Sequence, residues 1–344
     1  MLLRGLCICG IFFFFIGFGF ATSHQLDLRF YNARVPPNYP TIYVDQSGQG
    51  NFTTIQSAID SIPSNNGNWI CVYIKAGEYR EQVSISIDKP YIYLKGEGKR
   101  KTNVVWDGHD SITTSPTFIS QADNIVAKSI SFRNSYNNPP TGSNPIRPAV
   151  AAMISGDKSA FYRCGFFGLQ DTLWDVQGRH YFKLCSIQGA VDFVFGAGQS
   201  IYERCTISVI AEALDGLAGF ITAQGRSDPK DPNGFVFKGC NVIGTGRTYL
   251  GRPWREYARV VFYNSSLSDI VTPEGWDAWG NDLGREYMLT FAEHECYGKG
   301  SNTSNRVKWE ARLDRKTLTW LTSIGYIDNE GWISRQPFNM LTTT

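Results

Sequence analysis

The chain has 344 residues, and its 33 basic and 31 acidic side chains leave a formal net charge of only +2 at pH 7. A near-neutral chain without a basic run interleaved with aromatic residues is not expected to bind nucleic acid. Its aromatic content of 14% and its 34 glycines are typical of a strand-rich protein, and its length allows one large domain or two.

The first 21 residues have the pattern of a signal peptide. Arg4 precedes an apolar run that ends at Phe20, and the small residues Gly19 and Ala21 occupy the −3 and −1 positions of a cleavage site after Ala21. The run is too short and too rich in glycine to favour a membrane anchor. We therefore expect a secreted protein that has no membrane association after cleavage.

Residues 22–40 are predicted to form a polar, proline-bearing lead-in, and residues 41–344 a single domain. The domain opens with a strand, a turn and an amphipathic helix that ends before Pro63. The apolar residues of this helix lie on one face: Ile55, Ala58, Ile59 and Ile62. Such a helix would cover the open end of a solenoid, whose first coil otherwise exposes apolar surface. Short strands, rich in β-branched and aromatic residues, are expected between residues 69 and 106.

A short line of sequence recurs through the middle of the chain. Its copies begin at Ser129, Cys164, Cys185, Cys205, Cys240 and Ser265. The steps between them are 35, 21, 20, 35 and 25 residues, which indicates a base period of about 20 residues with longer insertions. This pattern is typical of a parallel β-solenoid, whose coils stack and whose insertions emerge as loops. We therefore expect an all-β parallel β-helix.

Two aspartates occupy equivalent places in adjacent copies of the line. Asp171 lies seven residues after Cys164, and Asp192 lies seven residues after Cys185, each among apolar and aromatic residues. Because adjacent parallel strands lie about 4.8 Å apart, the two carboxylates should stack and disturb each other's titration. We interpret them as a catalytic pair.

A stacked pair of carboxylates is compatible with two kinds of chemistry. Carboxylates about 5 Å apart could serve a retaining glycosidase. They could equally serve an esterase in which one carboxylate attacks a carbonyl and the other, protonated, donates to the leaving alcohol. Gln170 favours the esterase, because its amide N–H can stabilise an oxyanion. A Ser-His-Asp hydrolase has little support, because the chain has no G-x-S-x-G turn and only four histidines.

The segment Tyr249–Trp254 (YLGRPW) holds a cation and a flat apolar ring close together. Arg252 beside a carboxylate would keep that carboxylate ionised and would orient it. Trp254 could stack on a sugar ring. Beyond Thr272 the repeat disappears, and residues 306–327 carry helical stretches that could pack along the side of the solenoid. The tryptophans of this last part are interpreted as packing residues rather than substrate platforms: Trp276, Trp279 and Trp309.

Six cysteines remain after the predicted cleavage, and four of them stand at the same place in the repeat. Stacked strands would bring such positions within disulfide range in an oxidising compartment. Cys164–Cys185 and Cys205–Cys240 are therefore candidate disulfides, although the sequence does not determine the pairing. The mature chain has no C-x-x-C motif and no cysteine–histidine cluster, so we expect no structural zinc.

Three sequons mark possible sites of N-glycosylation in a secreted protein: Asn51, Asn264 and Asn302. Asn264 is the weakest candidate of the three, because it adjoins a predicted strand of the repeat. An unmodified turn residue is the stronger interpretation there.

The chain resembles the plant pectin methylesterases over nearly all of its mature length. The matching motifs are GEYRE (Gly77–Glu81), SGDKSAFYRC (Ser155–Cys164), GLQDTLWD (Gly168–Asp175), GAVDFVFG (Gly189–Gly196), ITAQGR (Ile221–Arg226) and YLGRPW. The resemblance implies a right-handed parallel β-helix that removes methyl esters from cell-wall homogalacturonan without a metal or another cofactor. It also implies a monomer of the cell wall, with a proteinaceous pectinesterase inhibitor as a second partner.

The resemblance also implies roles for the residues of the pair and their neighbours. Asp192 resembles the nucleophile and Asp171 the general acid/base, while Gln170 resembles an oxyanion donor and Arg252 the partner of the nucleophile. In such a mechanism Asp192 attacks the C6 carbonyl and Asp171 protonates the leaving methanol. Water then releases the acyl-enzyme with Asp171 as the base.

Three further residues resemble substrate-binding positions: Trp254 and Phe195 as walls of sugar subsites, and Thr117 as a binding threonine. The chain also departs from the family pattern. Pro148 stands where a glutamine usually supplies a second oxyanion donor, and proline has neither an amide side chain nor a backbone N–H. Losing one such donor costs about two to three orders of magnitude in rate when nothing replaces it. Ala190 stands where a threonine is common.

Two other functions remain open beside an active esterase. A pectin-binding wall protein, weakened by Pro148, would bind pectin without turnover. A pectin lyase or polygalacturonase on the same fold would shorten the chains instead of releasing methanol. No inhibitor-like segment stands between the predicted signal peptide and the catalytic domain, so the chain resembles the short form of the family.

Overall fold

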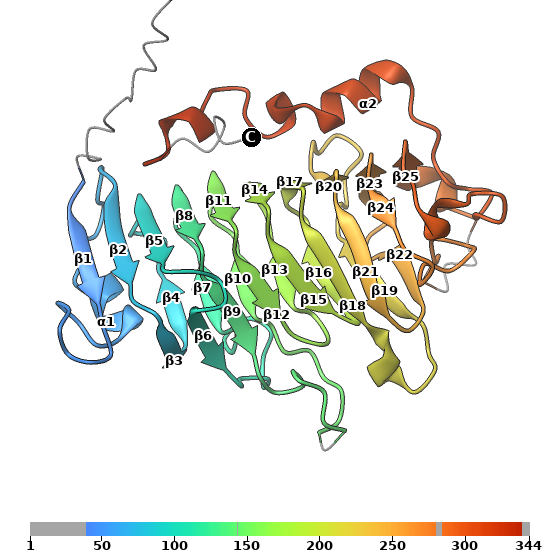
Figure 1. Cartoon of the computed structure of the whole chain (residues 1–344). Helices are drawn as coiled ribbons and strands as arrows, with labels where there is room; N and C mark the ends of the chain where they lie inside the picture. The colour runs from blue at the N-terminus through green and yellow to red at the C-terminus, as the bar shows by residue number, and fades with distance from the viewer. Residues whose placement is uncertain (1–38, 143, 280–283, 339–344) are drawn as a thin grey trace, which may run out of the picture. The chain divides into compact units, whose positions relative to one another are not determined.

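The structure, a computed structural model, describes residues 39–142, 144–279 and 284–338. These residues form a right-handed parallel β-helix in which successive coils stack along one axis (Figure 1). The predicted all-β solenoid is therefore confirmed. The predicted signal peptide, residues 1–21, and nearly all of the predicted lead-in lie outside the described residues. Within the described ranges, no helix is both long enough and apolar enough to cross a bilayer.

Three parallel sheets, named A, B and C here, surround a common core. Sheet A has ten strands: β1 (Thr41–Val44), β2 (Ile70–Ile74), β5 (Ile92–Gly96), β8 (Ile125–Lys128), β11 (Ser159–Tyr162), β14 (Arg179–Lys183), β17 (Gln199–Glu203), β20 (Gly234–Lys238), β23 (Arg259–Tyr263) and β25 (Thr290–His294). Sheet B has eight: β3 (Gly77–Arg80), β6 (Thr102–Trp106), β9 (Ser131–Asn134), β12 (Gly165–Phe167), β15 (Ser186–Gly189), β18 (Thr206–Ile210), β21 (Asn241–Thr245) and β24 (Ser266–Leu267). Sheet C has seven: β4 (Val83–Ile85), β7 (Phe118–Ser120), β10 (Ala152–Ile154), β13 (Leu173–Asp175), β16 (Val191–Gly196), β19 (Gly219–Gln224) and β22 (Thr248–Pro253).

Two α-helices and several 3₁₀ turns complete the described elements. The α-helices are α1 (Ile55–Asp60) and α2 (Arg315–Thr322). The 3₁₀ turns are η1 (Ala211–Leu214), η2 (Glu286–Met288), η3 (Lys299–Ser301), η4 (Ile324–Tyr326) and η5 (Ile333–Arg335).

The recurring sequence line corresponds to the turn from sheet A into sheet B. Gly165 pairs with Ser186, Ser186 with Thr206, and Thr206 with Asn241. Each of these residues directly follows a cysteine, so the four repeat cysteines stack in one line as predicted. The sequence period therefore measures the length of a coil correctly.

The predicted position of the first copy of the line, at Ser129, is wrong by one residue. Gly165 pairs with Ser131, so Ile130 rather than Ser129 occupies the position equivalent to Cys164. Ile130 is fully buried, whereas Ser129 lies in the preceding turn with a φ of 60°. The inward position takes the apolar side chain, because a slip of one residue would exchange the buried and exposed faces of the strand.

The predicted disulfides are not formed in this structure, in which all six cysteines from Cys71 to Cys296 are free thiols. Three of the four repeat thiols, all but that of Cys164, instead contact backbone carbonyls of the preceding coil. Cys185 donates to the Phe161 carbonyl at 3.3 Å, and Cys240 donates to the Tyr202 carbonyl at 3.1 Å. The S–H groups are thus used in hydrogen bonds between coils. The predicted disulfides Cys164–Cys185 and Cys205–Cys240 are wrong for this structure, in which these cysteines remain thiols.

Aromatic side chains at one inward position stack through the core: Phe161, Phe182, Tyr202, Phe237 and Phe262. Neighbouring ring centroids lie 4.5–5.1 Å apart, with interplanar angles of 7–11°. This near-parallel stacking follows from the solenoid, because equal positions in successive coils are separated by one strand spacing.

Helix α1 lies at the N-terminal end of the coils, where it packs against β1, β2 and β4, as the amphipathic pattern predicted. Its apolar face is fully buried: Ile55, Ala58, Ile59 and, just beyond the helix, Ile62. The Glu81 carboxylate accepts the N–H groups of Ile55 and Gln56 at 2.8 and 2.9 Å. These bonds satisfy two of the first-turn donors that a helix leaves without partners.

The C-terminal part of the chain returns along the outer face of sheet A, as α2 and the following turns in Figure 1 show. Leu318, Leu321, Ile327 and Trp332 pack on outward-facing residues of that sheet, including Tyr181. The prediction of helical stretches packed on the side is confirmed for residues 315–326, whereas residues 306–314 are not helical.

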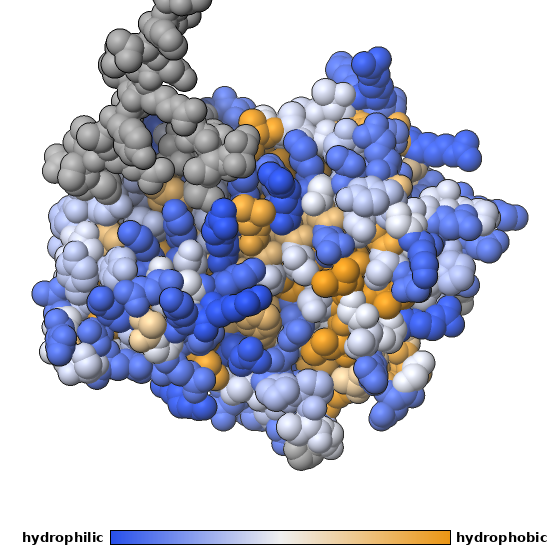
Figure 2. Space-filling model, viewed as in Figure 1, coloured by the Kyte–Doolittle hydropathy of each residue, from blue (hydrophilic) through white to orange (hydrophobic). Residues whose placement is uncertain are grey.

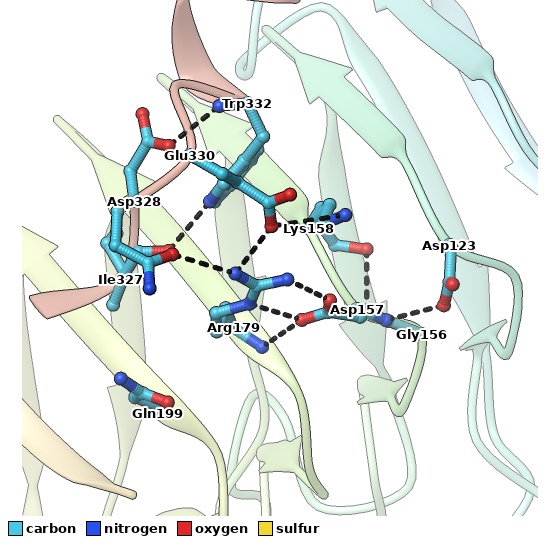
Figure 3. Close-up of polar contacts among 12 residues, drawn as sticks. Asp123, Gly156, Asp157, Lys158, Arg179, Gln199, Ile327, Asp328, Glu330 and Trp332 are labelled. Atoms are coloured by element: carbon cyan, nitrogen blue, oxygen red, sulfur yellow. Dashed lines mark hydrogen bonds and ion pairs between the residues drawn. The ribbon is translucent and has the colours of Figure 1, made fainter. Parts of the chain in front are cut away.

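A cluster of charges fastens this C-terminal segment to sheet A (Figure 3). Arg179 at the start of β14 donates to both oxygens of Asp157, at 3.0 and 2.5 Å, and pairs with Glu330 at 2.7 Å. Lys158 also approaches Glu330, at 3.2 Å. Burial alone would raise the pKa of Asp157, but the hydrogen bonds and the charge of Arg179 outweigh it and lower the pKa.

Replacing Arg179 by glutamine should lower the free energy of unfolding at pH 7 by about 1–3 kcal/mol, because it removes the cation that binds Asp157 and one of the two that approach Glu330. The lowered pKa of Asp157 gives stability that is present above the unfolded pKa, about 3.9, and lost as the pH falls through the folded value. The deficit of the variant should therefore shrink toward pH 3 in chemical denaturation. An equal deficit at pH 7 and pH 3 would exclude the charge cluster as its cause.

Candidate active site

Asp171 and Asp192 lie in successive coils, where the chain passes from sheet B into sheet C. Gln170 pairs with Val191, and the Asp171 N–H donates to the Val191 carbonyl at 3.0 Å. The two aspartates are therefore stacked neighbours, as the repeat predicted. Asp192 is 6% exposed, and Asp171 is partly buried.

The backbone is irregular at both aspartates. Their φ angles are 59° and 49°, in the left-handed region. Aspartate tolerates this region better than most residues, because its short side chain forms local hydrogen bonds. The pairing of β16 with β19 also shifts register between Val191 and Val194. Irregularities of this kind re-aim side chains and gather at active sites.

Arg252 binds one aspartate of the pair with both arms of its guanidinium. Its Nε donates to Oδ1 of Asp192 at 2.8 Å, and its Nη2 donates to Oδ2 at 2.6 Å. It reaches Asp192 from β22, two coils along sheet C, where Arg252 pairs with Ala223 and Ala223 with Phe195. Such two-pronged contacts fix both the charge and the orientation of a carboxylate.

Two aromatic rings enclose the guanidinium. The Arg252 Cζ lies 3.9 Å from the ring centroid of Phe220 and 3.8 Å from that of Trp279. Trp279, interpreted as a packing residue, does pack on the arginine of the pair, but it is 40% exposed and does not have the burial expected of it. Trp276, only 1% exposed, and Trp309, packed against the core, do have the packing role predicted.

The two carboxylates have different environments. Burial raises the pKa of Asp171 to about 7, the charge of Asp192 adds to the rise, and Arg252 opposes it. Burial also raises the pKa of Asp192, but there the hydrogen bonds and charge of Arg252 oppose the rise directly. Only Asp192 has the two-pronged arginine, so its ionised form is better stabilised than that of Asp171.

The pectinesterase family model matches residues 41–330. Among curated relatives, probable pectinesterase 29 of Arabidopsis thaliana is 58% identical over 300 residues, which cover 86% of this chain and 89% of that protein. Probable pectinesterase 55 of the same plant is 55% identical over 303 residues, 87% and 92% of the two chains.

Among solved structures, the pectin methylesterase from carrot superposes with a TM-score of 0.79 at 29% identity, over 87% of this chain and 97% of that one. The pectin methylesterase of Aspergillus niger gives a TM-score of 0.74 at 27% identity, over 88% and 97%. The chain belongs to the pectinesterase family. It is a carboxylic ester hydrolase that demethylesterifies pectin.

Gln170 lies in this pectinesterase beside the position that departs from the family pattern. The backbone of Pro148 pairs with Gln170 in the next coil, and Gln170 pairs in turn with Val191. Within the described residues the Gln170 side chain makes no hydrogen bond, so its amide is available to a ligand. Pro148 is therefore stacked on an expected oxyanion donor and supplies no donor of its own.

An aromatic stripe crosses the outer face of sheet C next to the aspartates. Trp174 stacks on Phe195 with ring centroids 5.4 Å apart, and Phe195 meets Trp254 edge-on at 6.0 Å. Phe195 and Trp254 were predicted as subsite walls; Trp174 was not. The sequence does carry a signal for it, because Trp174 and Phe195 each lie three residues after an aspartate of the pair.

A buried polar network lies behind the stripe and holds the end of β13. Asp175 contacts Nδ1 of His180 at 2.6 Å and accepts from the Tyr202 hydroxyl at 2.6 Å. Nε2 of His180 lies 2.9 Å from the Gly156 carbonyl and must carry a proton, because a carbonyl only accepts. The network joins three successive coils directly behind Trp174.

The remaining surface beside the pair is an open, mostly apolar pocket of about 670 Å³. It is lined next to Arg252 by Val191, Phe220, Ile146 and Leu217. Thr117 takes no part in such a surface, because it is fully buried and its hydroxyl donates to the Arg133 carbonyl at 3.0 Å. Among the described residues, no group of three or more His, Cys, Asp or Glu side chains could hold a metal ion.

Proposed function

We propose that Asp192 is the nucleophile and Asp171 the general acid and base with which this pectinesterase hydrolyses the methyl esters of cell-wall homogalacturonan. The observation that carries the assignment is the unequal sharing of Arg252, which binds both oxygens of Asp192 and favours its ionised form. A nucleophile must be ionised, whereas a general acid must hold a proton. The raised pKa of Asp171 meets the second requirement.

In the first half of the reaction an oxygen of Asp192 attacks the C6 carbonyl carbon of a methyl galacturonate unit. The carbonyl oxygen becomes an oxyanion, toward which the Gln170 amide would donate. When the C–O bond to the methoxy group breaks, Asp171 transfers its proton to the leaving oxygen and methanol departs. An acyl-enzyme remains on Asp192, and Asp171 is now a carboxylate.

In the second half water attacks the acyl-enzyme. The Asp171 carboxylate takes a proton from the water, and the resulting hydroxide adds to the C6 carbonyl carbon. The bond to Asp192 breaks, which frees the galacturonate and returns Asp192 to its pair with Arg252. Asp171 ends the cycle protonated, as it began, so the same residue is acid and base.

The substrate chain would lie along the aromatic stripe. Trp174 and Trp254 are partly exposed on sheet C, and sugars stack on such rings through their C–H faces. Phe195, only 4% exposed, supports the two tryptophan rings from between them. Trp279 adds a ring at the opposite side of Arg252. A role for Thr117 in binding would need its hydroxyl to exchange the Arg133 carbonyl for a ligand.

The protein would act in the cell wall after secretion, as a monomer. Asn51 and Asn302 are exposed, which supports glycosylation at these sequons. Asn264 is exposed as well, but it is the turn residue directly after β23, with a φ of 46°, as the unmodified interpretation expects. Its partners would be methylesterified homogalacturonan and a proteinaceous pectinesterase inhibitor.

Methanol release from highly methylated pectin, with chain length followed in the same tube, tests the assignment. Asp192→Asn should fold normally and lose about four orders of magnitude or more in kcat. Asp269→Asn, an exposed carboxylate outside the site, is the matched control and should keep full activity. Substantial methanol release by Asp192→Asn would refute the nucleophile, and shortened chains would indicate a depolymerase.

A second candidate function, pectin binding with weak or no turnover, is favoured by Pro148 beside Gln170. Pro148→Gln restores an amide donor at that position and should raise kcat by about tenfold or more. Pro148→Ala also removes the proline ring but adds no side-chain amide, so it should not raise kcat. If Pro148→Gln gives no gain over Pro148→Ala, another group already supplies the donor.

A further inference from the structure

A second cleft, separate from the active site, lies on the outer side of sheet B in the first coils. It has a volume of about 520 Å³ and shares no lining residue with the pocket beside Arg252. Its walls come from β3, β6, β9 and β12, together with residues 99–100 and 135–139. Register pairs Arg80 with Val105, Val105 with Arg133, and Arg133 with Phe167, so these four side chains form one line across the sheet.

The cleft concentrates positive charge. Four of its lining residues are cations and one is an anion: Arg80, Lys99, Arg100, Arg133 and Glu78. The chain as a whole is nearly neutral, with a formal net charge of +2. A concave surface with one sign of charge focuses the electric field and raises the local concentration of a counter-charged ligand.

Most of this charge has no carboxylate partner. The pair between Arg80 and Glu78 is solvent-exposed, with side chains 73% and 52% accessible, so it holds neither residue firmly. Lys99 donates to the Ser186 hydroxyl at 2.7 Å, which leaves its charge uncompensated. Among the described residues, no carboxylate oxygen lies within 4.0 Å of Lys99, Arg100 or Arg133.

Of the four cations in the cleft, Arg133 has the most contacts that orient its side chain. Its guanidinium donates to the Asn138 side-chain oxygen and lies 4.9 Å from the ring centroid of Phe167, while the rest of the side chain is partly buried. Asn138 is itself held by bonds to the Gly168 carbonyl and to Gln188, at 2.8 and 3.0 Å. The arginine is thus oriented by neutral groups, and its charge remains available to an anion in the cleft.

The reaction itself generates a polymer of the matching charge. Each ester hydrolysed leaves a carboxylate on the galacturonan, so product stretches are polyanions whereas esterified stretches are neutral. Arginine forks bind carboxylates through two parallel hydrogen bonds. The face of the molecule seen in Figure 2 is mostly hydrophilic toward the first coils.

We propose that the cleft formed by Arg80, Lys99, Arg100 and Arg133 is a second galacturonan-binding site, specific for de-esterified stretches. It holds the enzyme on the polymer that it has already processed, while the active site on sheet C acts on esterified units. It is separate from the catalytic assignment, because it binds carboxylates and needs no ester.

Binding of fully de-esterified oligogalacturonate, measured by titration calorimetry at about 10 mM ionic strength, tests the site under weak screening. The double variant Lys99→Gln/Arg100→Gln changes one partly exposed and one exposed side chain on one turn. It should weaken binding by about tenfold and reduce its dependence on salt. Arg133→Gln should do the same if it folds. The control Arg315→Gln/Lys316→Gln removes the same charge from α2 and should bind as the parent does.

The same variants distinguish this site from the active site. Methanol release from a short, fully esterified oligomer should be unchanged in Lys99→Gln/Arg100→Gln, because no free carboxylate is present to use the cleft. The proposal is overturned if the double variant binds de-esterified oligogalacturonate like the α2 control. It is also overturned if polyglutamate of equal charge binds as tightly, since the cleft would then be a nonspecific polyanion surface.

Discussion

The constraint on which this structure depends is the fixed register between successive parallel coils. Every strand pairs in parallel with the equivalent strands of the neighbouring coils, so residues about 20 positions apart become neighbours in space. The same register stacks the thiols of the cysteine line, the aromatic rings of the core, and the aspartates 171 and 192. Residues at the same offset in adjacent coils are therefore brought side by side by the register alone.

In the candidate active site the register stacks two aspartates, and the contact of Arg252 with only one of them makes their environments unequal. Two aspartates in equivalent positions, both with left-handed backbone, would by themselves be two similar carboxylates. Arg252, two coils away on the same sheet, reaches only Asp192 and is held in place by Phe220 and Trp279. The arginine thus favours the ionised form of Asp192 alone, and the proposed division of roles between the two aspartates rests on this difference.

Much of this could be predicted from the sequence, because a repeat reports spatial neighbours directly. The offset of seven residues from each cysteine placed Asp171 beside Asp192, and the resemblance to pectin methylesterases connected them to Arg252. The helix at Ile55 followed from its periodicity. The predictions that failed depend on the direction of a side chain, which the period of a sequence repeat does not specify. The stacked thiols donate to carbonyls and form no disulfide, and Trp279 covers an arginine rather than filling the core.

Contacts between distant segments were also beyond sequence reasoning. The clamp of Arg179 on Asp157 and Glu330 joins residues 151 positions apart, from 179 to 330, and no local pattern marks it. The one-residue error at Ser129 has a related origin, because serine and cysteine look equivalent in the repeat line. Burial of Ile130 decided the register instead.

The most direct test of the account is the pH dependence of the free energy of unfolding for the native protein and for Asp171→Asn. A folded pKa raised to about 7 means that native stability is fully present below the unfolded pKa and declines as the pH rises toward 7. The variant lacks this decline, so its stability relative to the native protein should grow between pH 4 and pH 8, by up to about 4 kcal/mol. A difference that stays constant over this range would mean that Asp171 titrates as an ordinary carboxylate, and would contradict the division of roles between the two aspartates.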